Sequence, residues 1–158
     1  MLFRSIRSQE RAKHKGFTQV MWLDGVERKY IEEIGTSNAF FVIDGTVVTP
    51  PLTGSILPGI TRDSCLQLLR KWGIPCEERP VAIDEVMAAA REGRLNESFA
   101  SGTAAVISPV GELTYKDESV VINNNEIGPL SQRLYDRLTA IQWGKEPDDM
   151  DWVRVISQ

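Results

Sequence analysis

Several classes of protein are excluded by what the sequence lacks. It has no apolar run close to the roughly 20 residues of a membrane-spanning helix. Met1–Lys15 is basic but contains no apolar stretch of signal-peptide length, so a cytoplasmic protein is expected. Histidine occurs once, as His14 between two lysines, and the two cysteines, Cys65 and Cys76, have no metal-ligand spacing. We therefore expect no membrane span, no metal site and two reduced thiols.

Positive charge is also scarce relative to negative charge. Lys plus Arg number 18 and Asp plus Glu number 22, which gives a formal net charge of −4 at pH 7. Nucleic-acid-binding proteins usually present a clustered basic face, so this balance argues against a nucleic-acid partner. Hydrophobic residues make up 42% of the chain and charged residues 25%, which is ordinary for a globular protein. A chain of 158 residues predicts a single domain, residues 1–158, with its own core.

Short runs rich in β-branched and aromatic residues predict strands. They lie at residues 19–23, 38–43, 46–49, 77–81, 98–100, 106–110 and 112–115. Because Asp44-Gly45 separates two of these runs, a hairpin is expected there.

Helical spacing or composition is present in other segments. The predicted helices cover residues 5–15, 61–72, 85–91 and 129–142. The side chain of Thr61 is expected to cap the second of them, and the acidic tail 146–151 is expected to be loose. Strands and helices that are mixed without regular alternation predict an α+β fold.

Three segments carry polar or glycine residues that packing alone does not require. Glu33 precedes an apolar strand, a Pro-Gly turn at 58–59 leads into a helix, and residues 101–105 form a turn of small residues. Free N–H groups at a helix start attract anions, and glycine lets a phosphate approach the backbone. Each segment also has a plain structural explanation, as a solvated carboxylate, a capped helix and a tight strand connection. Together they indicate an anion-binding α+β domain.

Longer motifs surround these segments. They are Gln19–Gly25 (QVMWLDG), Tyr30–Asn38 (YIEEIGTSN), Gly54–Ser64 (GSILPGITRDS), Gly102–Gly111 (GTAAVISPVG) and Asn123–Leu130 (NNNEIGPL). From about Ser5 to the C-terminus the chain closely resembles branched-chain amino acid aminotransferases, which are class IV enzymes that depend on pyridoxal phosphate. D-amino-acid aminotransferases and aminodeoxychorismate lyases share the LPGITR element and remain alternatives.

The resemblance implies a fold and a set of site residues. The fold is the C-terminal domain of a fold-type IV enzyme (D-amino-acid-aminotransferase-like), a barrel-like mixed sheet with surrounding helices. The implied cofactor-binding residues are Glu33 at the pyridine nitrogen, Leu57 against the ring, and Gly59, Ile60, Thr61 and Thr103 at the phosphate. Thr103 and Ala104 are implied to bind the substrate carboxylate through backbone N–H groups. A carboxylate beside the pyridine nitrogen keeps it protonated, so that the ring can accept electrons.

One part of the family pattern is missing. The family's Schiff-base lysine and a cofactor-bonding tyrosine come shortly before the segment aligned with Ser5–Arg7, where this chain has Met1–Arg4. We therefore expect that the chain lacks the N-terminal domain and any catalytic residue, and that alone it binds pyridoxal phosphate weakly or not at all. The complete enzyme would act on Leu, Ile or Val with 2-oxoglutarate, as a homo-oligomer. The alternative from a different class is a non-catalytic remnant or an anion- or partner-binding domain.

Overall fold

Residues 2–154 and 156 are described in this computed structural model, residues 2–6 by their backbone alone. The helices are α1 (Leu2–His14), α2 (Ile60–Lys71), α3 (Ile83–Arg91) and α4 (Pro129–Gln142), with a short 3-10 turn, η1, at Asn123–Asn125. The strands are β1 (Met21–Leu23), β2 (Ile31–Ile34), β3 (Ser37–Ile43), β4 (Thr46–Thr49), β5 (Cys76–Glu78), β6 (Leu95–Gly102), β7 (Val106–Pro109), β8 (Glu112–Tyr115) and β9 (Glu118–Val121). This mixture confirms the predicted α+β class.

β3 is the centre of the larger sheet, which has seven strands. Asn38 in β3 pairs with Glu33 of β2 on one edge and with Ser101 of β6 on the other. β6 follows β3 along most of its length, whereas β4 joins the β2 edge only further along. The sheet therefore forks beside β3, and at the fork the Thr49 hydroxyl donates to the carbonyl of Ala39 over 2.7 Å.

The sheet is mixed, as expected, because β4 and β5 run parallel while the other pairs are antiparallel. Within the described strands, β1, β5 and β7 each pair with one neighbour, so the sheet stays open and no closed barrel forms. The β8–β9 hairpin is a separate small sheet.

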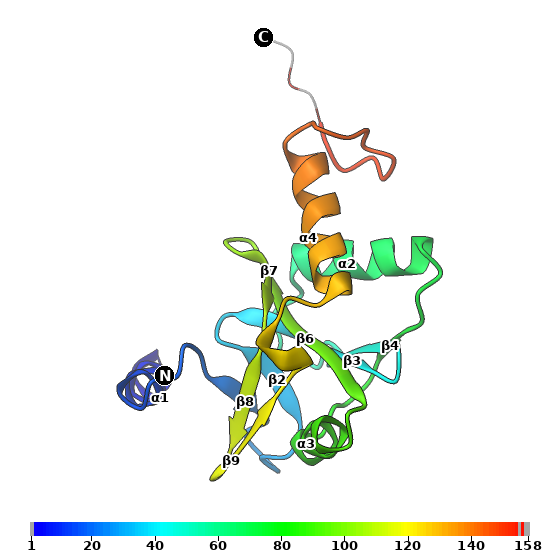
Figure 1. Cartoon of the computed structure of the whole chain (residues 1–158). Coiled ribbons are helices and arrows are strands. Elements are labelled where there is room, and N and C mark those ends of the chain that lie inside the picture. Colours follow the sequence, from blue (N-terminus) through cyan, green and yellow to red (C-terminus); the bar gives the residue numbers. More distant parts are fainter. Residues whose placement is uncertain (1, 155, 157–158) are drawn as a thin grey trace.

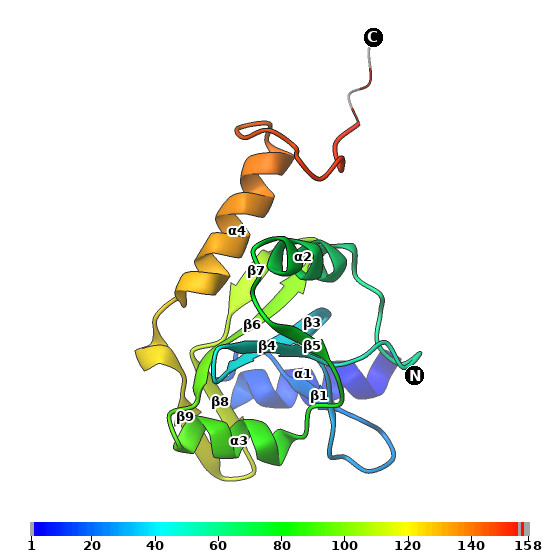
Figure 2. The same ribbon diagram turned by 90° about the vertical axis from the view of Figure 1, so that its right-hand side faces the viewer.

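Helices cover both faces of the sheet (Figures 1 and 2). On one face, Phe40 and Phe99 stack with ring centroids 5.0 Å apart and pack beneath α2 and α4. On the other face, Ala39 and Phe41 pack against α3 and the β8–β9 hairpin. Successive residues of β3 thus serve two different cores, as the alternation of side chains along a strand requires.

Helix α2 starts one residue earlier than predicted, and the predicted Thr61 cap is wrong. Gly59 is the N-cap residue, with extended backbone angles (φ −67°, ψ 133°), and no side chain caps the helix. The Gly59 carbonyl accepts the Asp63 N–H at 3.0 Å, which places Thr61 inside the first turn. Helix α4 has the predicted bounds.

Other sequence-based bounds were short or shifted. β6 extends well beyond the predicted residues 98–100, because it pairs with nearly all of β3. β5 begins before the predicted segment 77–81, and β2 and β9 had not been predicted as strands.

The acidic tail was wrongly predicted to be loose. Asp149 forms ion pairs with Lys71 of α2 at 2.5 Å and with Arg137 of α4 at 2.6 Å. Asp148 accepts backbone N–H groups of the following turn, including those of Trp152 and Val153 at 2.6 Å each. The tail thus links α2 to α4. Among the described residues, no helix has the length and apolar character that crossing a bilayer requires.

Candidate anion-binding site at the start of helix α2

The backbone of Leu57 is held from both sides by two paired residues of the sheet. Glu33 and Asn38 face each other across β2 and β3. The Glu33 Oε1 accepts the Leu57 N–H at 3.1 Å, and the Asn38 Nδ2 donates to the Leu57 carbonyl at 2.9 Å. The Leu57 side chain itself is 70% exposed. The fold therefore brings the predicted Glu33 and Leu57 together and leaves an apolar side chain free for a ligand.

The first turn of α2 follows directly. The first N–H groups of a helix have no intrahelical acceptor and need another partner. No side chain caps this turn, and within residues 2–154 and 156 the N–H groups of Ile60 and Thr61 have no acceptor. The Ile60 side chain is 81% exposed, so solvent reaches the turn. Three predicted phosphate residues, Gly59, Ile60 and Thr61, thus form an open helix start.

The turn between β6 and β7 lies at the same end of β3. Thr103 and Ala104 are exposed on it. The preceding Gly102 lies beside Ser37: a Cβ added at Gly102 would approach the Ser37 hydroxyl oxygen to 2.7 Å. Val106 closes the turn with a φ of 57°, a conformation that β-branched residues rarely adopt. Such strained backbone is concentrated at functional sites, where the surrounding fold maintains it.

Within the described part of the chain, no hydrogen bond joins Thr103 or Ala104 to the start of α2. Ala104 instead lines a cavity of about 770 Å³ together with Ile34, Ser37 and the segment 16–21 that follows α1. The β6–β7 turn, which lies beside Ser37, and the start of α2, which lies beside Asn38, are therefore neighbours, because Ser37 and Asn38 are consecutive residues of β3.

Behind the helix start lies a buried cation. Arg62 is 3% exposed, and its Nη2 donates to the Pro50 carbonyl at 2.9 Å and to Glu78 Oε2 at 2.8 Å. The hydrogen bond from Arg62 lowers the pKa of Glu78. Among the described residues, the Arg62 Nε and the hydroxyl of buried Ser101 have no hydrogen-bond partner. Unpaired buried polar atoms are costly and rare, and the Arg62 Nε is one of them within the first turn of α2.

Sequence reasoning assigned no role to Asn38 or Arg62. Asparagine is disfavoured in strands, so Asn38 at the start of the predicted strand 38–43 was an available signal. Arginine is almost never fully buried unless it is paired, but the burial of Arg62 is not visible in the sequence.

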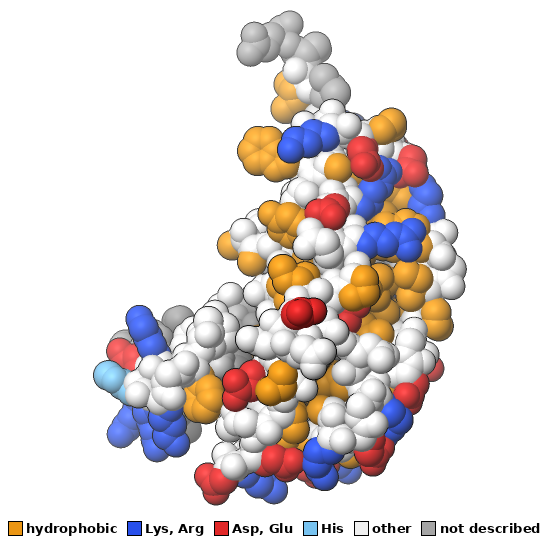
Figure 3. Space-filling view, viewed as in Figure 1, with side chains coloured by type: hydrophobic (Ala, Val, Ile, Leu, Met, Phe, Trp, Pro, Cys, Tyr) orange, Lys and Arg blue, Asp and Glu red, His pale blue; other side chains and the backbone are white. Residues whose placement is uncertain are grey.

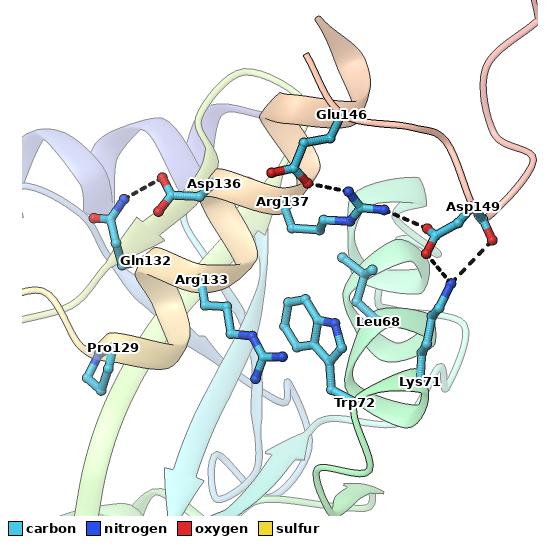
Figure 4. Close-up of a pocket in the computed structure, with 10 residues that line it drawn as sticks. All are labelled: Leu68, Lys71, Trp72, Pro129, Gln132, Arg133, Asp136, Arg137, Glu146 and Asp149. Atoms are coloured by element: carbon cyan, nitrogen blue, oxygen red, sulfur yellow. Dashed lines mark hydrogen bonds and ion pairs between the residues drawn. The ribbon is translucent and has the colours of Figure 1, made fainter. Parts of the chain in front are cut away.

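A second depression, of about 760 Å³, lies between α2 and α4 and is closed at one end by the tail (Figure 4). Its cations are occupied: Lys71 and Arg137 bind Asp149, and the Arg133 guanidinium lies 3.8 Å from the centre of the Trp72 ring. Apolar side chains also gather over these helices (Figure 3). None of the predicted site residues lines this groove, so it is not the predicted anion site.

The lysines of the chain are engaged or exposed away from these contacts. The ammonium groups of Lys29 and Lys116 lie over tyrosine rings, and Lys71 binds Asp149. Lys13, Lys15 and Lys145 are exposed, and none of the six lysines forms a hydrogen bond or ion pair with Glu33 in the described structure. The prediction about Met1 lies outside the described residues, and so do the side chains of residues 2–4. No group of three His, Cys, Asp or Glu side chains in the described part could hold a metal ion.

Comparison with known proteins identifies the family. Residues 2–113 match the family model described as amino-transferase class IV. The chain belongs to the class IV aminotransferases.

This class IV aminotransferase chain has close sequence relatives. It is 53% identical over 153 residues to branched-chain-amino-acid aminotransferase 2 of Bacillus subtilis. The matched region covers 97% of this chain and 42% of that relative. It is 56% identical over 148 residues to a probable branched-chain-amino-acid aminotransferase of Staphylococcus epidermidis, covering 94% and 41%. The chain thus spans about two fifths of the length of these relatives, and the matched part is their C-terminal portion.

Solved structures of branched-chain amino acid aminotransferases have the same fold. The branched-chain amino acid aminotransferase of Escherichia coli superposes with a TM-score of 0.80 at 30% identity, over 98% of this chain and 48% of that one. The enzyme of T.th., complexed with N-(5'-phosphopyridoxyl)-L-glutamate, has a TM-score of 0.78 at 26% identity, over 94% and 45%. The predicted fold type is therefore confirmed.

Proposed function

We propose that the chain is the pyridoxal-phosphate-binding part of a branched-chain amino acid aminotransferase. The observation that carries this is the open first turn of α2, directly beside Leu57 and Glu33. The family supports it, and so does the structural relative solved with a phosphopyridoxyl ligand.

The residues present fit the cofactor. Backbone N–H groups of Ile60 and Thr61 would bind the phosphate, because a helix start favours an anion. The exposed Leu57 side chain would lie against the ring. Glu33 uses Oε1 for Leu57, and its Oε2 has no partner in the described part of the chain, so it is available to the pyridinium N–H. Thr103 would add a phosphate contact.

Each of these groups has a distinct task in this proposal. Pyridoxal phosphate, when bound, supplies the electron-accepting ring of transamination. Glu33 keeps a proton on the ring nitrogen, and the α2 start fixes the phosphate end. The N–H groups of Thr103 and Ala104 would hold the carboxylate of the amino acid. The names of the relatives support Leu, Ile or Val as amino donors, and the proposed acceptor is 2-oxoglutarate.

Alone, these 158 residues should not catalyse transamination. The proton transfer at the substrate carbon needs a positioned base, and losing such a base typically costs about 10²–10⁴-fold in rate. Among the described residues, no lysine lines the cavity that Ser37 and Ala104 share, and Lys29, Lys71 and Lys116 have partners elsewhere. Borohydride reduction of the chain with pyridoxal phosphate should label no single lysine stoichiometrically, and Leu with 2-oxoglutarate should not be converted. Stoichiometric labelling together with steady turnover would contradict this.

Self-association is also proposed. Tyr135 and Trp143 of the α4 region are 42% and 77% exposed, and large exposed apolar patches mark interfaces. Light scattering at increasing concentration should show more than a monomer, and a monomer throughout would oppose the proposal.

The binding test compares three probes by equilibrium dialysis: pyridoxal phosphate, pyridoxal and inorganic phosphate. Glu33→Gln keeps an acceptor for the Leu57 N–H but removes the charge, so it should weaken pyridoxal phosphate roughly tenfold or more and leave inorganic phosphate unchanged. Glu32→Gln, a neighbour whose Oε1 accepts from Ser55 instead, is the control. Equal binding of phosphate and pyridoxal phosphate, insensitive to Glu33, would leave an anion-binding domain as the function.

A further inference from the structure

Asn38 is a buried amide at the fork of the sheet, and it has no role in the proposed chemistry. It is 4% exposed, and the adjacent Ser101 across β6 is fully buried. An amide in such a place must satisfy its polar groups, because an unpaired buried donor costs about 1–3 kcal/mol. Its contacts therefore show what it holds.

Both ends of the Asn38 amide are directed at the segment that precedes α2. The Nδ2 donates to the Leu57 carbonyl at 2.9 Å. The Oδ1 lies so close to Gly59 that a Cβ at that position would overlap it. Gly59 has a φ of −67°, which any residue adopts, so glycine is required there for close approach and not for its backbone angles.

These two contacts set the path of a short stretch of chain. Leu57 and Gly59 are separated only by Pro58, which has no N–H and a fixed φ. With Glu33 holding the Leu57 N–H, the segment is fixed on both sides just before the helix starts. A displacement of Gly59 would move the N–H groups of Ile60 and Thr61 with it.

We propose that Asn38 is a positioning residue, which fixes Leu57 and Gly59 so that the open start of α2 and the exposed Leu57 side chain present one surface to the cofactor. The proposal rests on the proposed function of this site. Asn38 touches no ligand atom in it, and acts through the backbone of residues 57–59.

The first test needs no cofactor. Amide hydrogen exchange reports the Leu57 N–H, which is protected by Glu33. In Asn38→Ala the Leu57 amide should exchange at least about tenfold faster, since the segment loses one of its two anchors. Asn38→Asp, which keeps the shape but replaces the donor, should act in the same direction. Unchanged exchange of Leu57 in both variants would overturn the proposal.

The second test separates positioning from stability. Ser131→Ala is the matched control, because it also removes a buried side-chain hydrogen bond, 2.7 Å long, but at the start of a different helix, α4. Both variants should lower the melting temperature. Only Asn38→Ala should weaken pyridoxal phosphate, by roughly tenfold. An equal affinity in Asn38→Ala and the parent chain would contradict the role.

A double-mutant cycle gives the sharpest readout. Gly59→Ala places a methyl group against the Asn38 oxygen, so it should weaken binding strongly in the parent chain. In the Asn38→Ala background this overlap is gone, and the added effect should fall at least several-fold, because contacting residues are not additive. Additive effects would refute direct coupling of the two residues.

The outcomes also distinguish the two proposals. If the parent chain binds no pyridoxal phosphate while Leu57 exchange still depends on Asn38, the proposed function is wrong, but Asn38 does fix the backbone of residues 57–59. If the parent binds the cofactor and neither affinity nor exchange depends on Asn38, the inference is wrong and the function stands.

Discussion

Helices α2 and α4 both begin after a glycine, yet the free N–H groups of their first turns differ. Those of α4 have a side-chain acceptor, whereas those of α2 have none in the described part of the chain. At α4, the buried Glu97 carboxylate accepts the N–H groups of Leu130 and Ser131 at 2.9 Å each. Gly128 is needed there because a Cβ would overlap that carboxylate. At α2, the residue against Gly59 is a neutral amide, and the first N–H groups have no acceptor in the described part of the chain. The first turn of α4 thus binds a carboxyl group from β6, whereas the first turn of α2 is open to an external ligand.

The difference shows how similar local geometry can serve stability or binding. An anion at a helix start is stabilising, and at α4 the carboxyl group of Glu97 from β6 occupies that position. The same position at α2 has solvent access, with Ile60 81% exposed, and holds no internal charge. In the proposed function, an external phosphate would take at α2 the place that the Glu97 carboxylate occupies at α4.

Removing the internal anion should have the largest effect on stability. Glu97→Ala leaves the N–H groups of Leu130 and Ser131 without their acceptor and opens a buried space, at a cost of about 3 kcal/mol. Chemical denaturation would measure it, with Glu97→Gln as a milder comparison. A loss under about 0.5 kcal/mol, the range of ordinary surface changes, would show that the carboxylate does not hold α4.

The two glycines offer a direct contrast. Gly128→Ala should chiefly lower stability, because its methyl group meets the buried Glu97 carboxyl group. Gly59→Ala should chiefly weaken pyridoxal phosphate, by roughly tenfold or more, because its methyl group displaces the start of the open helix. Melting temperature and equilibrium dialysis on both variants separate the effects. The opposite assignment, or equal profiles for the two, would remove the distinction between the helix starts.

The support behind α2 should show a smaller effect, with a pH dependence. Arg62→Ala leaves the Pro50 carbonyl without this donor and Glu78 with Arg70 alone, at a cost of about 2 kcal/mol after discounting for the partial exposure of Glu78. Arg70→Ala, which removes the more exposed partner of the same carboxylate, should cost under about 1 kcal/mol.

The sign with pH follows from the lowered pKa of Glu78. Its stabilisation is present above the ordinary glutamate pKa of 4.5 and is lost as the pH falls through the lower value of the folded state. The stability difference between the parent chain and Arg62→Ala should therefore be constant near neutrality and shrink in acid. A difference that grows in acid would contradict the pairing.

The tail should matter least. Lys71 lowers the pKa of Asp149 most and Arg137 adds to it, yet all three side chains are reached by solvent. Asp149→Asn should lower the melting temperature slightly, and less at high salt, because screening already weakens exposed pairs. Cofactor affinity should not change, and a large change would link the tail groove to the site.

Much of this fold could be predicted from local patterns. The bounds of α4 follow from Pro129 and from apolar residues at helical spacing, and the β3–β4 hairpin follows from Asp44-Gly45. The helix after Pro58-Gly59 and the turn of small residues between β6 and β7 were also predicted, because both are local features. The start of α2 was missed by one residue, since the Thr61 hydroxyl is not the group that meets the first turn.

Features that depend on distant contacts could not be predicted in this way. The roles of Asn38 and Glu33 depend on the register between β2 and β3 and on a loop some 20 residues further along. The ordered tail depends on Asp149 reaching Lys71, which is 78 residues away. Buried Arg62 and Glu97 are polar residues whose partners come from other elements, so their burial does not follow from the local sequence.

The most direct measurement is an amide NMR titration of the 158-residue chain with inorganic phosphate and then with pyridoxal phosphate. We expect saturable shifts for the Ile60 and Thr61 amides with both probes, further shifts around Leu57 only with pyridoxal phosphate, and none for Leu130 and Ser131. Shifts that leave Ile60 and Thr61 unmoved, or that appear equally at the start of α4, would contradict it.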